Sequence, residues 1–481
     1  MRTFISFLFA LTTLTVQAAG MGYDDARHLL ARTGFAPTES EVQTYAKLSR
    51  AQAVDKLLSE TRAEAQTLPP SWVSEPPTPL RAIKDLSEEE RKQFQRQQME
   101  RGVALRSWWY QEMLVTPTPL TERMTLFWHN HFVSSQQKVK SAQLMYRQHV
   151  LLRSYALGNF GELLHAVSKD PAMILYLDNA TNRRGQPNEN FAREVMELFT
   201  LGVGQYTEQD IKEAARAFTG WSLDRANGEF HFYRLLHDGG TKTVLGRSGD
   251  FDGDAVLDIL LAQPQTAEFI SAKLWREFVS PDPDVKEVQR LARILREARY
   301  EIKPLLRALF SSEAFYVPAN RARLIKSPVD LLVGTLRQFG IEGLDTRLLV
   351  FSGRQLNQDL FGPPNVKGWP GGDDWINSTT LLARKQFMER IFRAEEMPLD
   401  RRTLREEMGP GAARAMAGQA MLANLRFDVP AFFGAFKGGE AQQRASVERL
   451  VLSSPASHKP AASERMEFIR QLVLDPVYQL K

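Results

Sequence analysis

The chain has 481 residues, with 61 Lys and Arg against 57 Asp and Glu, and 43% of its residues are apolar. It contains no cysteine, which excludes disulfides and lipid attachment through an N-terminal Cys, so the fold depends on its hydrophobic core alone. The charges are interspersed and almost balanced. Because nucleic-acid-binding proteins usually carry a basic patch or stripe, no nucleic-acid partner is expected.

The N-terminus has the pattern of a secretory signal peptide. Arg2 precedes an apolar run from Phe4 to Leu14, and Val16 and Ala18 occupy the two small positions that a signal peptidase recognises. The run is shorter than the roughly 20 apolar residues that are needed to span a membrane. We therefore predict that residues 1–18 are a signal peptide cleaved after Ala18, and that the mature protein is exported to the periplasm or the medium without a membrane anchor.

The mature chain, residues 19–481, shows helical spacing of apolar side chains along most of its length. A good example begins at Thr207, an N-cap with Asp210 three residues later, and ends at Gly220. Residues 68–82 hold prolines at a density that excludes regular helix and predicts a proline-rich strap across the surface. We predict a mainly α fold: one large helical domain that forms an irregular multi-helix globular body.

Two segments resemble strands. Glu229–Leu236 alternates partly between apolar and polar residues, and Lys242–Gly246 is short and contains β-branched residues. Together they predict a small β-hairpin, residues 229–246, inserted among the helices.

The first candidate site is the stretch FWHNHF, which holds His129 and His131. On a helix, His131 shares an apolar stripe with Leu120, Met124 and Phe127, whereas His129 points to the opposite side. The two imidazoles bind one ion only if the helix ends between them or if the segment is extended. The alternative is packing, with a hydrogen-bonded core imidazole at His131 and an exposed His129.

The second candidate is the predicted helix PNENFAREVMELFTLGVG. Asn190, Glu194 and Glu197 lie on one face beside its apolar stripe. Arg193 is spaced to form i, i+4 salt bridges with Glu189 and Glu197. Glu194 has no such partner within its own helix. A carboxylate beside an apolar stripe is costly unless it is paired, protonated or bound to a metal, so Glu194 is a candidate ligand or base.

The third candidate is HDGGTKTVLG, in which His237 and Asp238 precede two glycines and Lys242. This pattern is typical of an ordinary turn with solvated polar side chains. It also fits a ligand or base that is oriented by the carboxylate next to it.

A fourth stretch, from Phe361 to Phe387, is dense in Pro and Gly around Trp369 and Trp375. A loop of this composition is stiff. The two indoles either plug the helical body as a structural clasp or form an aromatic platform in a ligand cleft, with sugar as the usual ligand of such a platform.

Four stretches, in chain order, resemble the bacterial family catalogued as domain of unknown function 1800: FWHNHF, NENFAREVMELFTLGVGQYTEQDIKEAARAFTGW, HDGGTKTVLG and PPNVKGWPGGDDWINSTTLLARK. The resemblance covers most of the mature chain. It implies export, because proteins of this family are typically exported, and it implies as a partner another exported protein encoded nearby. Some relatives carry His at the position of Phe199, and the resemblance implies no reaction.

Two classes of function fit these residues. The first is an exported metal-assisted hydrolase, in which His129, His131 and Glu194 bind a divalent ion such as Zn, Mn or Fe. Catalytic groups would come from Glu194, His237 and Asp238. The rest of the predicted pocket comprises Asn190, Arg193, Glu197, Lys242, Trp369 and Trp375.

The second class is a non-catalytic exported binding or assembly factor, in which the same polar residues form a buried hydrogen-bond network. Its partner would be the exported protein encoded nearby or a polymeric substrate. Under either function, His131, Glu194 and His237 are expected to converge on one pocket, because polar groups beside apolar stripes are costly to bury separately.

Overall fold

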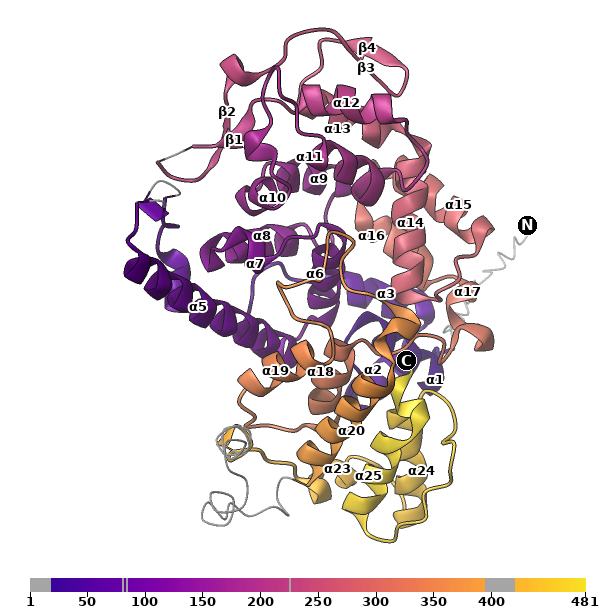
Figure 1. Cartoon of the computed structure of the whole chain (residues 1–481). Coiled ribbons are helices and arrows are strands. Elements are labelled where there is room, and N and C mark those ends of the chain that lie inside the picture. Colours follow the sequence, from indigo (N-terminus) through magenta and orange to yellow (C-terminus); the bar gives the residue numbers. More distant parts are fainter. Residues whose placement is uncertain (1–18, 80–81, 84, 225, 394–419) are drawn as a thin grey trace, which may run out of the picture.

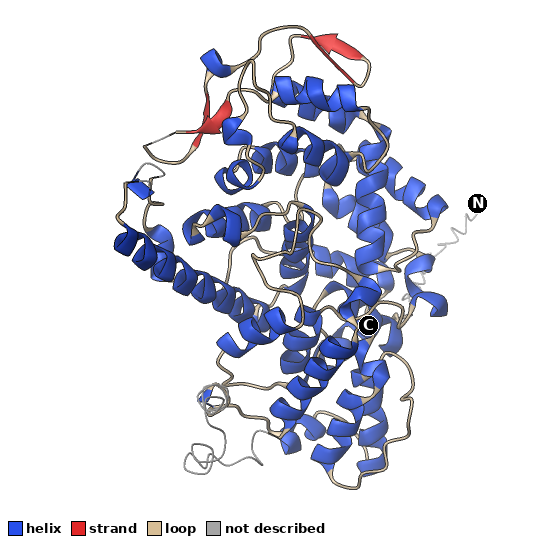
Figure 2. Ribbon diagram, viewed as in Figure 1, coloured by secondary structure: helices blue, strands red, loops and turns tan. Residues whose placement is uncertain are grey.

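The computed structural model describes residues 19–79, 82–83, 85–224, 226–393 and 420–481. The predicted signal peptide lies outside these residues. Helices dominate the described chain, which confirms the mainly α prediction (Figure 2). Within the described ranges, no helix is long and apolar enough to cross a membrane.

The first third of the chain forms helices around a central one, α6 (Figure 1). The elements are α1 (Tyr23–Thr33), α2 (Glu39–Ala46), α3 (Arg50–Ser59), η1 (Ser71–Ser74), α5 (Glu88–Val115), α6 (Pro119–His131), α7 (Gln136–Val139), α8 (Ala142–Ser154), α9 (Phe160–Ser168), α10 (Pro171–Tyr176) and η2 (Asn179–Thr181). The described part of the proline-rich segment lies against the long helix α5, since Glu75 forms an ion pair with Arg101, whose guanidinium also covers the ring of Trp72.

The next part of the chain builds one end of the molecule, at the top of Figure 1. Its elements are α11 (Asn190–Glu194), the π-helical turn η3 (Val195–Thr200), α12 (Glu208–Ala217), β1 (Trp221–Leu223), β2 (Phe230–Phe232), η4 (Arg234–Leu236), β3 (Lys242–Val244), β4 (Arg247–Gly249) and α13 (Gly253–Ala262). Thr207 and Asp210 form the predicted reciprocal cap of α12, because each side chain accepts a backbone N–H from the other residue.

The remaining elements pass back along the body to the opposite end. They are α14 (Pro264–Phe278), α15 (Val285–Glu297), α16 (Ile302–Phe310), α17 (Glu313–Tyr316), η5 (Pro318–Asn320), α18 (Pro328–Phe339), α19 (Arg347–Gln355), η6 (Gly372–Trp375), α20 (Ser378–Phe392), α23 (Val429–Gly434), α24 (Glu440–Val451), α25 (Arg465–Leu474) and η9 (Pro476–Gln479).

The predicted hairpin exists as two smaller pairs of strands. β2 pairs with β1, with Trp221 opposite Phe232, and β3 pairs with β4, with Lys242 opposite Gly249; both pairs are antiparallel. The pairing predicted within residues 229–246 is therefore wrong. The reason is local: η4 follows β2 directly, and the chain after it is bound to the end of α12 before β3 begins.

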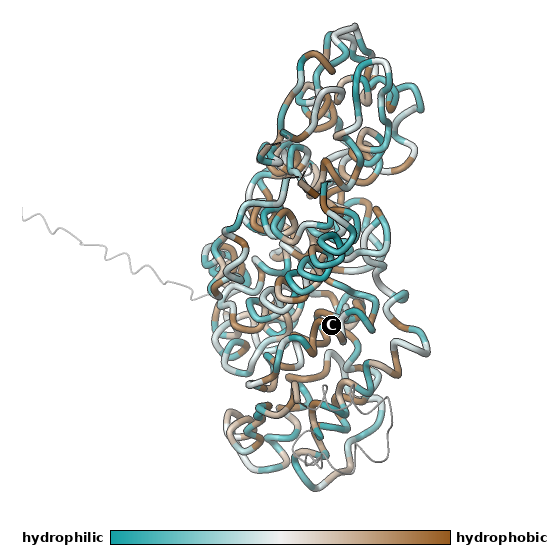
Figure 3. The backbone as a smooth tube through the Cα atoms, turned by 60° about the vertical axis from the view of Figure 1, so that its left-hand side comes forward, coloured by the Kyte–Doolittle hydropathy of each residue, from teal (hydrophilic) through white to brown (hydrophobic). Residues whose placement is uncertain are grey.

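One connected cluster of buried apolar side chains runs through the described elements, from Ala26 in α1 to Tyr478 in η9. Figure 3 shows that hydrophobic segments are distributed along the whole length of the body. A chain without disulfides depends on such a core, since burial of apolar surface is the main favourable contribution to folding.

Candidate functional site

Helix α6 is buried on nearly all sides, and both of its histidines are in the core. His129 is only 3% exposed, so the expectation that it is exposed is wrong. The side of α6 that carries it is covered by Trp109 of α5, His149 of α8 and the ring of Phe361. Nε2 of His129 lies 3.2 Å from Nδ1 of His149, and burial lowers the pKa of His129 to about 3.

His131 points to the other side of α6 and joins two further helices. Its Nε2 donates to the backbone oxygen of Phe199 (3.1 Å), and its Nδ1 accepts from Nζ of Lys273 (2.9 Å); this tautomer is assigned from the hydrogen bonds. The Phe199 carbonyl is free for this bond because it belongs to the last turn of its helix, where carbonyls lack partners within the helix. Burial, reinforced by the charge of Lys273, holds the pKa of His131 well below its usual range.

The second motif forms α11 and the π-helical turn η3. Arg193 pairs with Glu189, as predicted, and also with Glu208, whereas Glu197 accepts a hydrogen bond from Tyr206 instead of pairing with Arg193. Nδ2 of Asn190 donates to the carbonyl of Leu177 (3.1 Å). These residues therefore fix how the segment packs.

Glu194 is half-buried and forms no hydrogen bond or ion pair with any residue that the structure describes. Burial raises its pKa, and the nearby charge of Glu197 raises it further. The charges of Arg193 and Lys367 oppose this shift.

The third motif is bound to the C-terminal end of α12. Nδ1 of His237 donates to the carbonyl of Thr219 (2.9 Å), and Asp238 forms an ion pair with Arg216 (2.8 Å). The hydrogen bond from Arg216 lowers the pKa of Asp238 to about 2. Nζ of Lys242 lies 3.3 Å from Asp250. His237 and Asp238 thus bind separate partners. This arrangement agrees with the interpretation of the motif as an ordinary turn, not with a base that is oriented by the neighbouring carboxylate.

A cavity of about 640 Å³ lies between α6, α14, α18 and the loop that carries the two tryptophans. His131, Trp369 and Trp375 line it. Glu194, His237 and the other residues predicted to converge with His131 are not among its lining residues. The structure therefore brings the FWHNHF motif and the tryptophan motif together at this cavity. The second motif, which holds Glu194, is linked to it only by the Phe199 carbonyl and by the charge of Lys367.

The tryptophan loop closes over the end of α6. Trp369 and Trp375 are 4% and 5% exposed, and the indole N–H of Trp369 donates to the carbonyl of Asp359 (3.1 Å). The backbone N–H of Trp369 donates to Oδ1 of Asn130 (2.7 Å). Gly368 has φ of 91°, and a Cβ there would lie 2.2 Å from Asn130, so this close approach requires glycine. Both indoles are thus clasps that also form part of the cavity wall.

The cavity wall has more cations than carboxylates. Six cationic side chains line it, Arg123, Lys273, Arg276, Arg323, Lys367 and Lys481, against the four acidic side chains Glu277, Asp282, Asp330 and Asp373. The ion pairs use Arg123, Lys481 and Arg323. In the described part of the chain, Lys273, Arg276 and Lys367 form no ion pair with a carboxylate. The wall therefore carries an excess of positive charge.

His131 and the two tryptophans of this cavity were predicted from the sequence, whereas its cations were not. Lys273 interrupts the apolar pattern of FISAKLW, between Ile270 and Leu274, both fully buried. A lysine among buried apolar residues was the one sign in the sequence that Lys273 has a special role. Lys367, in the loop before Trp369, gave no signal of its own, because an exposed lysine in a loop is common.

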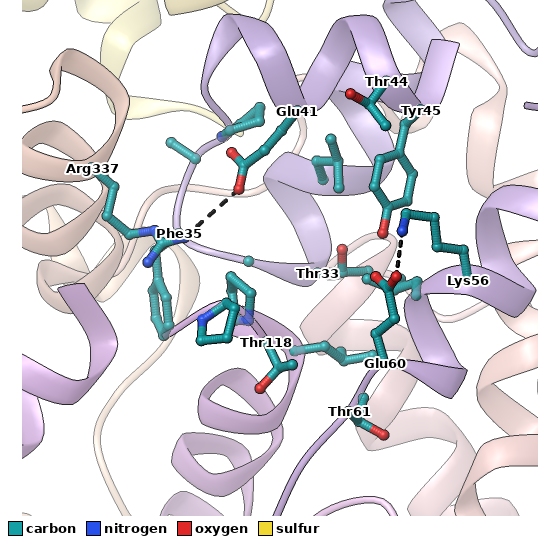
Figure 4. Close-up of a pocket in the computed structure, with 18 of the residues that line it drawn as sticks. Thr33, Phe35, Glu41, Thr44, Tyr45, Lys56, Glu60, Thr61, Thr118 and Arg337 are labelled. Atoms are coloured by element: carbon teal, nitrogen blue, oxygen red, sulfur yellow. Dashed lines mark hydrogen bonds and ion pairs between the residues drawn. The ribbon is translucent and has the colours of Figure 1, made fainter. Parts of the chain in front are cut away.

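A second, smaller cavity of about 250 Å³ lies among α1, α2, α3, α6 and α18. Figure 4 shows its charged side chains facing one another: Glu41 with Arg337 (3.8 Å), and Lys56 with Glu60. Its charges thus compensate one another. It contains none of the predicted site residues, so the cavity of about 640 Å³ is the stronger candidate of these two.

The predicted metal ligands do not form a donor set. His129 and His131 bind separate partners on opposite sides of α6, and Glu194 bonds to neither. Across the residues that are placed, no group of three or more His, Asp and Glu side chains is arranged to hold one ion. A divalent ion therefore does not fit these residues.

The chain matches the family described as "Protein of unknown function (DUF1800)" over residues 28–458, nearly its whole length. No curated protein and no solved structure matches it. The chain belongs to the DUF1800 family, as its four motifs predict, and the family's description names no activity.

Proposed function

For this member of the DUF1800 family, we propose that the cavity at the end of α6 binds an organic anion. The observation that carries the proposal is the excess of positive charge, with Lys273, Arg276 and Lys367 free of ion pairs among the described residues. Cations that lack a carboxylate partner attract an anion to the cavity, and the partly enclosed wall strengthens the attraction relative to open water.

The remaining wall suits the organic part of such a ligand. The apolar and aromatic part of the wall is formed by Leu126, Phe127, Pro281, Leu324, Ile325, Pro370, Trp369 and Trp375. A volume of about 640 Å³ lies within the range of small-molecule sites, which is about 300–1,000 Å³. A ring with a carboxylate, phosphate or sulfate group fits both the charge and the apolar surface.

Selectivity for charge is the test of this proposal. Three sugars that share a pyranose ring differ in charge: glucuronate is an anion, glucose is neutral and glucosamine is a cation. Calorimetric titration of the mature protein should show the highest affinity for glucuronate and the lowest for glucosamine. We expect the affinity for glucuronate to fall as salt is added, because screening weakens the attraction. Citrate and glucose 6-phosphate serve as additional anions. If none of the three anions binds better than glucose, the proposal is wrong.

Charge-reversal variants localise the binding. Arg276→Glu and Lys367→Glu should each weaken binding of the anion about tenfold, which corresponds to about 1.4 kcal/mol. Lys286→Glu is the matched control, since Lys286 is exposed on α15 and is not a lining residue. An equal loss of affinity in all three variants would indicate a general charge effect and not a site.

We also propose that the protein acts outside the cytoplasm, because residues 1–18 have the pattern of a signal peptide. Intact mass spectrometry of the protein from periplasm or medium should show Ala19 as the first residue. Recovery of the full-length chain from the cytoplasm alone would contradict export.

A further inference from the structure

The amine of Lys273 has an unusual environment for a lysine. Lys273 lines the cavity, and its Nζ lies 2.9 Å from Nδ1 of His131 and 5.0 Å from the centroid of the Phe269 ring. Neither contact supplies negative charge, because His131 is neutral and Phe269 is apolar. Lysine ammonium groups are usually solvated or paired with a carboxylate. Lys273 is only partly exposed to solvent, and it has no carboxylate partner among the described residues.

Three of the four carboxylates that line the cavity already form ion pairs with other side chains. Glu277, one turn further along α14, pairs with Arg123, and Asp330 of α18 pairs with Arg123 and Lys481. Asp282 pairs with Arg323.

The other charged side chains of the wall are the cations Arg276 on α14 and Lys367 on the tryptophan loop, and the carboxylate Asp373. Burial lowers the pKa of Lys273 to about 8, and the charge of Arg276 adds to the shift. More of this amine is therefore unprotonated near neutral pH than in an ordinary exposed lysine, and only the unprotonated form is a nucleophile.

We propose that Lys273 reacts with carbonyl compounds: it condenses with an aldehyde or ketone group of an anionic ligand held in the cavity. The nitrogen lone pair attacks the carbonyl carbon, a carbinolamine forms, and loss of water leaves a C=N imine, so the amine and the carbonyl compound give an imine and one molecule of water. No oxidant or reductant takes part. The anionic class of the ligand rests on the proposed function, whereas the reactivity of the amine rests on its own surroundings.

Reductive trapping tests the proposal directly. Glyoxylate carries an aldehyde and a carboxylate, and cyanoborohydride reduces its imine to a stable carboxymethyl-lysine. The mature protein is treated with both at pH 7.5, and peptides are quantified by mass spectrometry. We expect Lys273 to be modified roughly 10–100 times faster than the exposed Lys286, because far more of its amine is unprotonated at this pH. The rate should rise with pH through about 8.

Two controls separate reactivity from binding. Citrate, which competes for the cavity, should slow modification of Lys273 and leave that of Lys286 unchanged. Lys273→Arg keeps the positive charge but has no amine, so it should lose the modification at this position, whereas the modification of Lys286 should continue at its usual rate. Propanal, an uncharged aldehyde, should show a weaker preference for Lys273 than glyoxylate shows.

The outcomes are distinct. If citrate binds and Lys273 is modified no faster than Lys286, the inference is wrong and the proposed function stands. If Lys273 reacts quickly with propanal and glyoxylate alike and no anion binds, the proposed function is wrong, and so is the assignment of an anionic carbonyl ligand to Lys273.

Discussion

Asp330→Asn should lower the free energy of unfolding by about 3–5 kcal/mol, the range measured when one partner of a buried ion pair is removed. Asp330 is 4% exposed and accepts hydrogen bonds from Arg123 and from Nζ of Lys481 (2.7 Å). Its other role is to cap α18, by accepting the backbone N–H of Ser327 (3.0 Å). Asparagine keeps the shape but leaves the buried Lys481 without a counter-charge and leaves Arg123 with Glu277 alone. Urea unfolding followed by circular dichroism measures the loss.

Asp282→Asn is the control, because Asp282 forms the same kind of ion pair at the surface. Its side chain is 78% exposed and its partner Arg323 is 54% exposed, so the loss should be about 0–1 kcal/mol. A loss for Asp330→Asn as small as that of the control would show that the buried cations do not depend on this carboxylate.

The acid stability of the wild-type protein should depend on the same group. Burial alone would raise the pKa of Asp330, but the charges of Arg123 and Lys481 hold it well below its usual range. A carboxyl group with a lowered pKa in the folded state stabilises the protein above its unfolded pKa, and this stabilisation is lost as the pH falls toward the folded pKa. Asp330→Asn should therefore unfold with a weaker dependence on pH below about 4.

Features set by neighbours in the sequence were predictable. The cap of α12 depends on Thr207 and Asp210, which lie three residues apart. Gly220, predicted to end the same helix, has a positive φ of 84°. Such signals act within one or two helical turns, so the sequence alone contains them.

Features set by distant residues were not predictable. The period of its own helix predicts that His129 is exposed, but it is buried because Trp109, His149 and Phe361 cover it, the last of them more than two hundred residues away. The strands show the same limit, since β2 pairs with the earlier segment Trp221–Leu223, which carried no strand signal of its own. One helix or one strand does not determine what packs against it.

The candidate site combines both cases. His131 was predicted to face the core from helical spacing, and it does. Its partner Lys273 comes from a helix 142 residues later in the sequence, and nothing in FWHNHF indicates which helix packs there. The positive charge of the cavity arises only from this packing, since the composition of the whole chain is almost balanced.

Tyr478→Ala should lower the free energy of unfolding by about 3–5 kcal/mol, the usual loss when a large buried aromatic side chain is truncated. Tyr478 is 1% exposed, its hydroxyl lies 2.8 Å from that of Thr335, and Nζ of Lys326 lies 3.6 Å above its ring. The residues after it lie along the chain before α18, where Lys481 donates its backbone N–H to Leu324 (2.8 Å). Loss of the ring therefore also loosens the segment that brings Lys481 to Asp330. Urea unfolding measures the change.

Tyr478→Phe separates the ring from its hydroxyl. The phenylalanine keeps the packing and the contact with Lys326, and Thr335 still donates to the carbonyl of Leu331 (2.7 Å). Only one hydrogen bond is lost, so the free energy of unfolding should fall by about 0.5–1.5 kcal/mol. If Tyr478→Ala costs no more than Tyr478→Phe, the ring contributes little, and the end of the chain is not anchored in the core by it.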